Sequence, residues 1–579
     1  MEYPTLYVKD RSRQMVDDFG GYNHNMRIGE NEFYNMKNMT SDHYPVLAPR
    51  KNRGVYKDGV QANAIIAKDK LCYVDGSAFV IGNDRIDMGL TNEPKTLVSM
   101  GAYVIILPDR KYIDTLSTED WGNIDVVNKT TGGVTIEPCT IEGDTGEASD
   151  VEPEDPFDGE LWLDTSNKST HILKRYSADS KEWVSLPKSY VKVSGNGIAN
   201  GLQKYDGVTI SGLTENQLNG SKVVYELYDF DDNENDEIII SGSVSKAVTQ
   251  DGSVTVSRKM PDLDYIVESG NRLWGCKYGN QPGRGFVNEI YASALGSFKN
   301  WDCFMGTSQD SYRASCGTDG SFTGAIAYRG TPLFFKEDFV YEVYGNAPSN
   351  FQIQSTACRG VQNGCGKSVA IVNETVFYKS RSGVCAFDGS MPVDVSAALG
   401  DVIYSDAVAG AHGNKYYISM KDEDGNANFF VYDTRKNLWH REDDLAVDAI
   451  CSYKNDVYCI ESGTKRIVSL FGTGVMDSKR VPWMVETGIL GMTSPDMKYV
   501  SKLLLRLSLE PAAKVRVSIQ YDSIGIWHQV CQITAASLRS FSIPIKPHRC
   551  DHFRIRIEGE GISRIYSITK TIEQGSDIS

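Results

Sequence analysis

The 579-residue chain contains almost no sustained apolar repeat of 3.6 residues, which argues against a fold built from amphipathic helices. It is instead a succession of short β-forming runs, each bounded by Gly, Asp, Asn or Ser. Residues 71–74 and 78–81, for example, flank the turn Asp75-Gly76-Ser77. Paired runs of this kind recur at intervals of roughly 30–50 residues, which is the spacing of propeller blades. We therefore expect an all-β fold class with a β-propeller core.

Changes in pattern along the chain divide it into five expected parts. Residues 142–160 hold nine acidic residues, no basic residue, Pro153 and Pro156, as in a solvated linker. Beyond residue 500, apolar and polar residues alternate, as in a sandwich with one wet face. We expect an N-terminal docking arm with the first strand (1–62), the first part of the propeller (63–125), an inserted small β module or modules (126–255), the second part of the propeller (256–480) and a C-terminal antiparallel β-sandwich (481–579).

The net charge of the chain limits how it can interact with nucleic acid. The formal net charge is −16, whereas a protein that grips nucleic acid needs Lys and Arg to displace counterions from phosphates. An acidic wall would instead repel phosphates and let a polyanion pass. The 12 Cys include no Cys-x-x-Cys pair, so we expect free buried thiols in a chain made in a reducing compartment.

The sequence shows no signal that would target the chain to a membrane. The start, Met1-Glu2-Tyr3-Pro4, lacks a charged segment followed by an apolar one, so we expect no signal peptide. No run approaches the length of about 18 apolar residues that a transmembrane helix requires.

No recognised catalytic motif is present. The chain has neither a Gly-x-Ser-x-Gly elbow nor a phosphate-binding Gly-rich loop, and none of its 8 His lies in a recognised catalytic context. His548 and His552 flank the start of a strand, where a turn with satisfied polar groups is a better interpretation than a metal site. Residues 231–237 begin like a calcium loop but lack its later Gly and Glu, so a solvated hairpin tip is favoured. We expect no enzyme activity, no cofactor and no metal.

Three hairpins pair a Tyr with a Trp across a polar turn. These pairs are Tyr176 with Trp183, Tyr432 with Trp439, and Tyr521 with Trp527. Two rings that clasp across a hairpin stiffen it, and this structural interpretation is favoured over a sugar-binding turn.

The first 110 residues resemble the opening of podovirus tail nozzle proteins, also called tail tubular protein B. The resemblance comprises Phe19-Gly20-Gly21, an Asn-rich step at 35–38, Tyr44-Pro45, and the basic entry into the first blade at 50–54. Residues 99–106 are similar to the next blade of that family. Residues 342–387 are similar to blades of phage tail hub and DNA-stabilisation proteins, whereas the 126–255 insertion departs from the pattern.

The resemblance implies a structural virion protein of a bacteriophage tail, a nozzle or hub that is assembled in the host cytoplasm. Copies of the chain would form a ring, a hexamer by analogy with the family, around a channel that retains genomic DNA and conducts it at ejection without sequence-specific binding. The expected partners are a portal, an adaptor or other tail proteins, and tail fibres or spikes. The expected assembly and docking residues are Phe19, Gly20, Gly21, Tyr44, Pro45, Arg50 and Arg53.

A second function stays open, namely a propeller-type tail tip protein that binds or hydrolyses glycans. Such a protein would need an Arg or carboxylate cluster at the propeller centre. A glycan-binding protein would in addition expose Trp and Tyr side chains in a groove.

Overall fold

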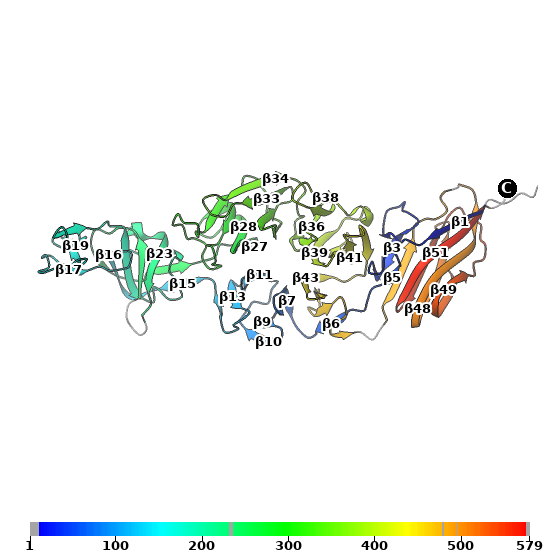
Figure 1. Cartoon of the computed structure of the whole chain (residues 1–579), viewed down its shortest axis with the longest axis horizontal. Coiled ribbons are helices and arrows are strands. Elements are labelled where there is room, and N and C mark those ends of the chain that lie inside the picture. The colour runs from blue at the N-terminus through cyan, green and yellow to red at the C-terminus, as the bar shows by residue number, and fades with distance from the viewer. Residues whose placement is uncertain (1–10, 231–235, 477–479, 494, 575–579) are drawn as a thin grey trace, which may run out of the picture. The chain divides into compact units, whose positions relative to one another are not determined.

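A computed structural model describes residues 11–230, 236–476, 480–493 and 495–574, and it is built from β-strands (Figure 1). The helices in this described part are three single 3₁₀ turns at Asn216–Leu218, Gly366–Ser368 and Ala397–Leu399, and none is long and apolar enough to span a membrane. The chain divides into two compact units. The first comprises Met1–Lys95, Phe335–Phe339 and Ala357–Ser579, and the second comprises Thr96–Phe334 and Val340–Thr356.

Three four-stranded antiparallel sheets lie wholly or mostly in the second unit. Their first strands pack side by side in chain order, which is how neighbouring propeller blades meet. The sheets are β11(Thr96–Met100) to β14(Trp121–Asn123) with β12(Tyr103–Leu107) and β13(Lys111–Asp114); β27(Tyr265–Ser269) to β30(Tyr312–Ser315) with β28(Arg272–Gln281) and β29(Gly285–Ala292); and β31(Gly324–Tyr328) to β34(Gln352–Ala357) with β32(Thr331–Phe335) and β33(Phe339–Tyr344).

The first unit holds three further blades of four antiparallel strands, the last of which is the end of a larger sheet. They are β7(Ala62–Ala67), β8(Leu71–Asp75), β9(Ala78–Ile81) and β10(Asp84–Asp87); β35(Ala370–Val372), β36(Thr375–Ser380), β37(Gly383–Phe387) and β38(Val393–Asp394); and β39(Ser405–His412), β40(Lys415–Lys421), β41(Ala427–Asp433) and β42(Leu438–Arg441).

One more blade of this unit is assembled from two distant parts of the chain. β43(Val447–Tyr453), β44(Asp456–Glu461) and β45(Ile467–Ser469) are consecutive, and β6(Gly54–Lys57) pairs with β45. The short strand β46(Val475–Met476) pairs with the other edge of β6. A strand that precedes the first blade thus completes the last one, and the blade cannot form until both parts of the chain are present.

The insertion in the second unit begins and ends in one antiparallel pair, β15(Val126–Lys129) with β26(Thr255–Arg258). Its eight-stranded sheet encloses an aliphatic core that includes Ile136, Val193 and Ile240. The remaining strands are β16(Thr131–Cys139), β21(Tyr190–Asn196), β22(Gly207–Ser211), β23(Gly220–Tyr228), β24(Asp236–Ser241) and β25(Val248–Asp251). A smaller sheet extends from it, made of β17(Glu147–Ser149), β18(Leu161–Asp164), β19(Ile172–Ser177) and β20(Glu182–Ser185). The acidic segment 142–160 thus contributes a strand, β17, to this small sheet.

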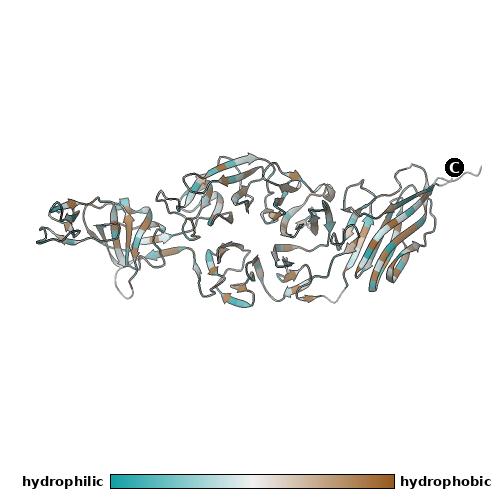
Figure 2. Ribbon diagram, in the orientation of Figure 1, coloured by the Kyte–Doolittle hydropathy of each residue, from teal (hydrophilic) through white to brown (hydrophobic). Residues whose placement is uncertain are grey.

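The C-terminal strands of the first unit form a sandwich around the long strand β48(Lys498–Tyr521). The first half of β48 pairs with β51(Ser563–Gln574), its second half pairs with β50(Phe553–Glu560), and β49(His528–Ile543) pairs along the other edge of both halves. Hydrophobic and hydrophilic residues alternate along these strands (Figure 2), and the inward residues Leu505 and Val517 are almost fully buried. The expected propeller core, inserted β module and C-terminal sandwich are confirmed.

The N-terminal segment is built into the sheets of the first unit. β1(Arg11–Val16) pairs with β51, and β2(Gly21–Tyr22) pairs with β42 of a blade. β3(Glu32–Lys37) lies between β2 and β47(Pro482–Thr487), and β47 pairs with β50. One hydrogen-bonded sheet therefore extends from the blade β39–β42 into the sandwich. Docking of this segment on another protein stays a prediction.

Candidate binding pocket

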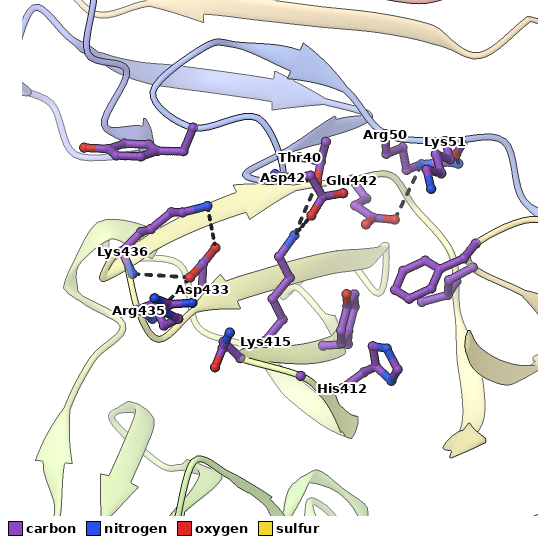
Figure 3. Close-up of a pocket in the computed structure, with 16 residues that line it drawn as sticks. Thr40, Asp42, Arg50, Lys51, His412, Lys415, Asp433, Arg435, Lys436 and Glu442 are labelled. Carbon is purple, nitrogen blue, oxygen red and sulfur yellow. Dashed lines mark hydrogen bonds and ion pairs between the residues drawn. The ribbon is translucent and has the colours of Figure 1, made fainter. Parts of the chain in front are cut away.

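A pocket of about 660 Å³ lies within the first unit, at the end of the blade β39–β42 (Figure 3). One wall is the loop that joins β4(Met39–Thr40) to β5(Ala48–Pro49), two strands that pair with each other. The turns β39–β40 and β41–β42 and the segment after β45 supply the other walls. The ionisable lining residues are Asp42, Tyr44, Arg50, Lys51, His412, Lys415, Tyr417, Asp433, Arg435, Lys436 and Glu442.

Polar contacts fasten the β4–β5 loop to the blade. Lys415 Nζ donates to Asp42 Oδ1 at 2.6 Å and lies 3.3 Å from Thr40 Oγ1. Ser41 Oγ donates to Asp433 Oδ2 at 2.6 Å, and Lys436 Nζ donates to the Ser41 carbonyl at 2.7 Å. Figure 3 shows Lys415 reaching from its strand to Asp42. The loop is thus held in one position against the turn that follows β41.

These contacts keep the two aspartates of the pocket ionised. Burial pushes the pKa of Asp42 upward, but the charge and hydrogen bond of Lys415 outweigh it, and the pKa lies below its ordinary value of 3.8. The pKa of Asp433 is also below 3.8, because the Ser41 hydrogen bond and the charges of Lys436 and Lys415 outweigh burial. Both side chains therefore act as hydrogen-bond acceptors at neutral pH.

Two arginines and two acids form a mostly buried cluster at one side of the pocket. Arg53 donates to Asp443 Oδ2 at 2.6 Å and to Glu442 Oε2 at 2.8 Å, while Arg50 lies 3.1 Å from Asp443 and 3.5 Å from Glu442. Burial raises the pKa of Asp443, but the two guanidinium groups outweigh it and hold the pKa below 3.8. Arg50 and Arg53 are therefore engaged within their own chain, and removing one partner would leave a buried charge.

Aromatic side chains complete the lining. Tyr44 is 39% exposed, and Lys436 Nζ lies 5.5 Å from the centre of its ring. His412 Nδ1 lies 2.7 Å from Ser452 Oγ, and its ring meets Phe471 edge to face at 5.3 Å. The Ser452 contact fixes the orientation of the imidazole ring beside the pocket. The pocket thus combines exposed aromatic surface with ionised donors and acceptors.

A histidine near this charge network is held neutral. His440 on β42 is buried, and burial together with the charge of Lys415 lowers its pKa to about 3. Its Nδ1 has no hydrogen-bond partner among the residues that the structure describes. A buried imidazole of this kind cannot take up a proton at neutral pH without loss of stability.

The structure disperses the predicted docking residues. Tyr44 and Arg50 line the pocket, and Pro45 lies exposed in the same β4–β5 loop. Phe19 is buried against Phe33, and the Gly20 amide donates to the Asn31 carbonyl. Gly21 begins β2, and Arg53 belongs to the buried ion cluster. Whether any of them binds another protein stays a prediction.

The sequence analysis missed Lys415, Asp433 and Lys436 as site residues. The available signal was the polar turn Asp433-Thr434-Arg435-Lys436 between two aromatic strands, which was interpreted as the tip of a stapled hairpin. That staple exists, because Tyr432 pairs with Trp439 and their rings are 4.9 Å apart. The turn that it shapes also supplies one wall of the pocket.

The other motifs have structural partners. Tyr176 and Trp183 clasp as predicted, at 5.4 Å, whereas Trp527 packs on Arg556 and leaves Tyr521 to contact His548. His552 contacts Asp551 and Ser523. In the described parts of the chain, no group of three or more His, Cys, Asp or Glu side chains is placed to hold a metal ion. Most of the calcium-like segment 231–237 lies outside the described residues.

Comparisons with known proteins identify no family for this chain. No family model and no curated protein matches it. Among solved structures, an exo-β-1,3-galactanase from Phanerochaete chrysosporium is 9% identical, with a TM-score of 0.22 over 53% of this chain and 94% of the galactanase. The phage phi92 endosialidase is 10% identical, with a TM-score of 0.24 over 88% of this chain and 80% of the endosialidase. A Trypanosoma rangeli sialidase is 10% identical, with a TM-score of 0.21 over 87% of this chain and 94% of the sialidase.

These comparisons correct one expectation. The chain was expected not to be an enzyme because it lacks a recognised catalytic motif, and the comparisons contradict that expectation. The solved structures similar to the chain include glycoside hydrolases and sialidases. At these identities and TM-scores the likeness assigns no activity to this chain.

Proposed function

We propose that this propeller protein binds carbohydrate and that the pocket beside the β4–β5 loop is its binding site. The observation that carries the proposal is the exposed ring of Tyr44 next to the ionised pairs Asp42–Lys415 and Asp433–Lys436. A sugar ring presents C–H groups on its faces and hydroxyl groups around its edge. An aromatic ring can pack against the C–H faces of the sugar. Carboxylates accept hydrogen bonds from the sugar hydroxyl groups, and ammonium groups donate hydrogen bonds to them.

The size and rigidity of the pocket suit such a ligand. Its volume of about 660 Å³ lies within the usual range of roughly 300–1,000 Å³ for ligand sites. The loop wall is already fixed by the Lys415 and Lys436 contacts, so little order has to be created on binding. Because a preformed site loses little conformational entropy on binding, more of the interaction energy contributes to affinity.

Binding of the sugar and its hydrolysis are tested with the same set of oligosaccharides. A glycan array probed with the full chain is expected to show binding to a defined set of oligosaccharides, followed by calorimetry on the best of them. Incubation of the same oligosaccharides with the protein, with analysis of the reducing ends, tests hydrolysis. Absence of binding to every glycan on the array would overturn the proposal.

Two variants locate the binding. Tyr44→Ala is expected to weaken affinity about three- to tenfold, the effect of one lost aromatic contact. The matched control is Tyr344→Ala, which removes another exposed tyrosine, one on β33, and is expected to leave affinity unchanged. Equal affinities for the two variants would place the ligand elsewhere.

The tail-nozzle role, the ring of copies and the virion location remain predictions from the resemblance in the first 110 residues. Antibody against this chain, applied to phage particles and imaged by negative stain, is expected to label the tail. Labelling confined to the capsid, or none at all, would contradict that role.

A further inference from the structure

We infer that the ligand of the pocket is an acidic saccharide, one that carries a carboxylate. This inference rests on the proposed carbohydrate-binding function and adds the ligand's charge to it. The pocket is lined by five cationic side chains and three carboxylates, although the whole chain has a formal charge of −16. A positive pocket in an acidic protein attracts anions specifically to that place.

The pocket's own carboxylates do not neutralise all of these cations. Asp42 is taken by Lys415, and Asp433 by Lys436 and Ser41. Glu442 is taken by Arg53 and Arg50. Every acid of the pocket thus already has a cationic partner from the protein.

Two cations are left over. In the part of the chain that the structure describes, neither Lys51 nor Arg435 has a carboxylate within 4.0 Å of its side-chain nitrogens, and both residues are exposed. The backbone amide of Arg435 donates to Asp433 Oδ1 at 3.2 Å. Figure 3 shows the two residues on different sides of the pocket, Arg435 beside Asp433 and Lys51 beside Arg50. Each side therefore offers one free positive group to a bound ligand.

The chemistry of these groups favours carboxylates spaced along a chain of sugars. A guanidinium binds a carboxylate through two parallel hydrogen bonds, and an ammonium acts as a compact point charge. A saccharide with two carboxylates could place one beside Lys51 and the other beside Arg435. The sugar rings between the carboxylates would then pack against Tyr44. A nucleic acid needs many phosphate contacts for affinity, and this acidic chain supplies only two free cations here.

The first experiment uses one array that carries neutral glycans together with glycans containing uronic or sialic acid. The strongest acidic ligand is then compared by calorimetry with the same oligosaccharide after reduction of its carboxyl groups to alcohols. We expect the acid to bind about ten times more tightly than its reduced form at low salt, and the difference to shrink in 0.5 M NaCl as the charges are screened.

Variants assign the effect to the two cations. Lys51→Gln combined with Arg435→Gln is expected to lower affinity for the acidic ligand about tenfold and to leave affinity for the reduced ligand unchanged. Lys259→Gln removes an exposed cation elsewhere and is the matched control, for which no change is expected. Circular dichroism of the three proteins checks that each is folded.

The outcomes separate this inference from the proposed function. Equal affinity for the acid and its reduced form, or binding to neutral glycans only, overturns the acidic ligand and leaves carbohydrate binding intact. Absence of binding to all glycans overturns both. Tighter binding of a DNA oligonucleotide than of any acidic glycan, lost in the double variant, overturns the inference in favour of a nucleic-acid site.

Discussion

Lys415 Nζ lies 2.6 Å from Asp42 Oδ1, and this ion pair joins a loop near the start of the chain to a blade strand 373 residues later. The lysine side chain is mostly buried and the aspartate is half exposed. The pair therefore contributes both to the shape of the pocket and, modestly, to the stability of the first unit.

Asp42→Asn is expected to lower the free energy of unfolding by about 0.5–1 kcal/mol, because a partly exposed ion pair contributes little in water. It should also weaken binding of the carboxyl-reduced saccharide, which gains nothing from the charge of the released Lys415, because the loop loses one of its contacts with the blade. Urea denaturation and calorimetry measure the two effects. Asp406→Asn breaks the exposed pair with Lys421 and serves as the control, with no expected change in binding.

Lowering the pH should destabilise the first unit over a pH range set by the pKa of His440. Its folded pKa of about 3 lies below the ordinary 6.5, so the unfolded chain takes up a proton first as the pH falls. This contribution is fully present above pH 6.5 and is lost between 6.5 and 3, with a slope of at most about 1.4 kcal/mol per pH unit. Unfolding free energies at pH 7.5, 5.5 and 4.5 should fall less steeply for His440→Leu. Parallel pH curves for the two proteins would refute this assignment.

Gly21→Ala should be strongly destabilising. Gly21 has φ of 86°, and a Cβ built there would lie 2.6 Å from the Trp439 carbonyl oxygen. Gly76→Ala, at φ of 58° with open space around it, isolates the cost of the backbone conformation, about 1 kcal/mol. Gly21→Ala should cost about 1–3 kcal/mol more, because β2 must move away from β42. Equal midpoints of thermal unfolding for the two variants would show that the strands adjust freely.

Asn300 holds the insertion to the blade β27–β30 in the second unit. Its Oδ1 accepts from the Gly207 amide at 3.0 Å, and its Nδ2 donates to the Tyr205 carbonyl at 2.7 Å. Asn300→Ala leaves both groups without this partner and should cost about 1–3 kcal/mol. Hydrogen exchange at Gly207 should accelerate, while exchange in β43 and β44 of the first unit should stay the same. Unchanged protection at Gly207 would show that water replaces the asparagine.

Short-range features were predictable from the sequence because the interacting residues are close in the chain. The clasps of Tyr176 with Trp183 and Tyr432 with Trp439 follow from hairpin geometry alone. The predicted contact between Tyr521 and Trp527 was wrong, because Trp527 packs against Arg556 on β50 instead. No local sequence pattern reveals that neighbour. The same limit applies to β6, whose partner β45 lies some 400 residues later in the chain.

The pocket could be predicted only in part for the same reason. Tyr44 and Arg50 stood out in the sequence, but their role was interpreted as docking. Lys415 and Asp433 are unremarkable charges at strand ends until folding places them opposite residues 41–42. Charge balance inside a pocket depends on which pairs form, and pairing across hundreds of residues is not visible in composition.

The sheet that runs from β42 through β2 and β3 to β47 joins the blade that bears the pocket to the C-terminal strands of the first unit. The narrowest step of this sheet is β2, where Tyr22 pairs with Trp439 of β42 and two residues pair with β3, so tension on the C-terminal strands would reach the blade through very few backbone hydrogen bonds. If the C-terminal strands are where an outside force acts, the blade that bears the pocket is the first part of the propeller to carry the load.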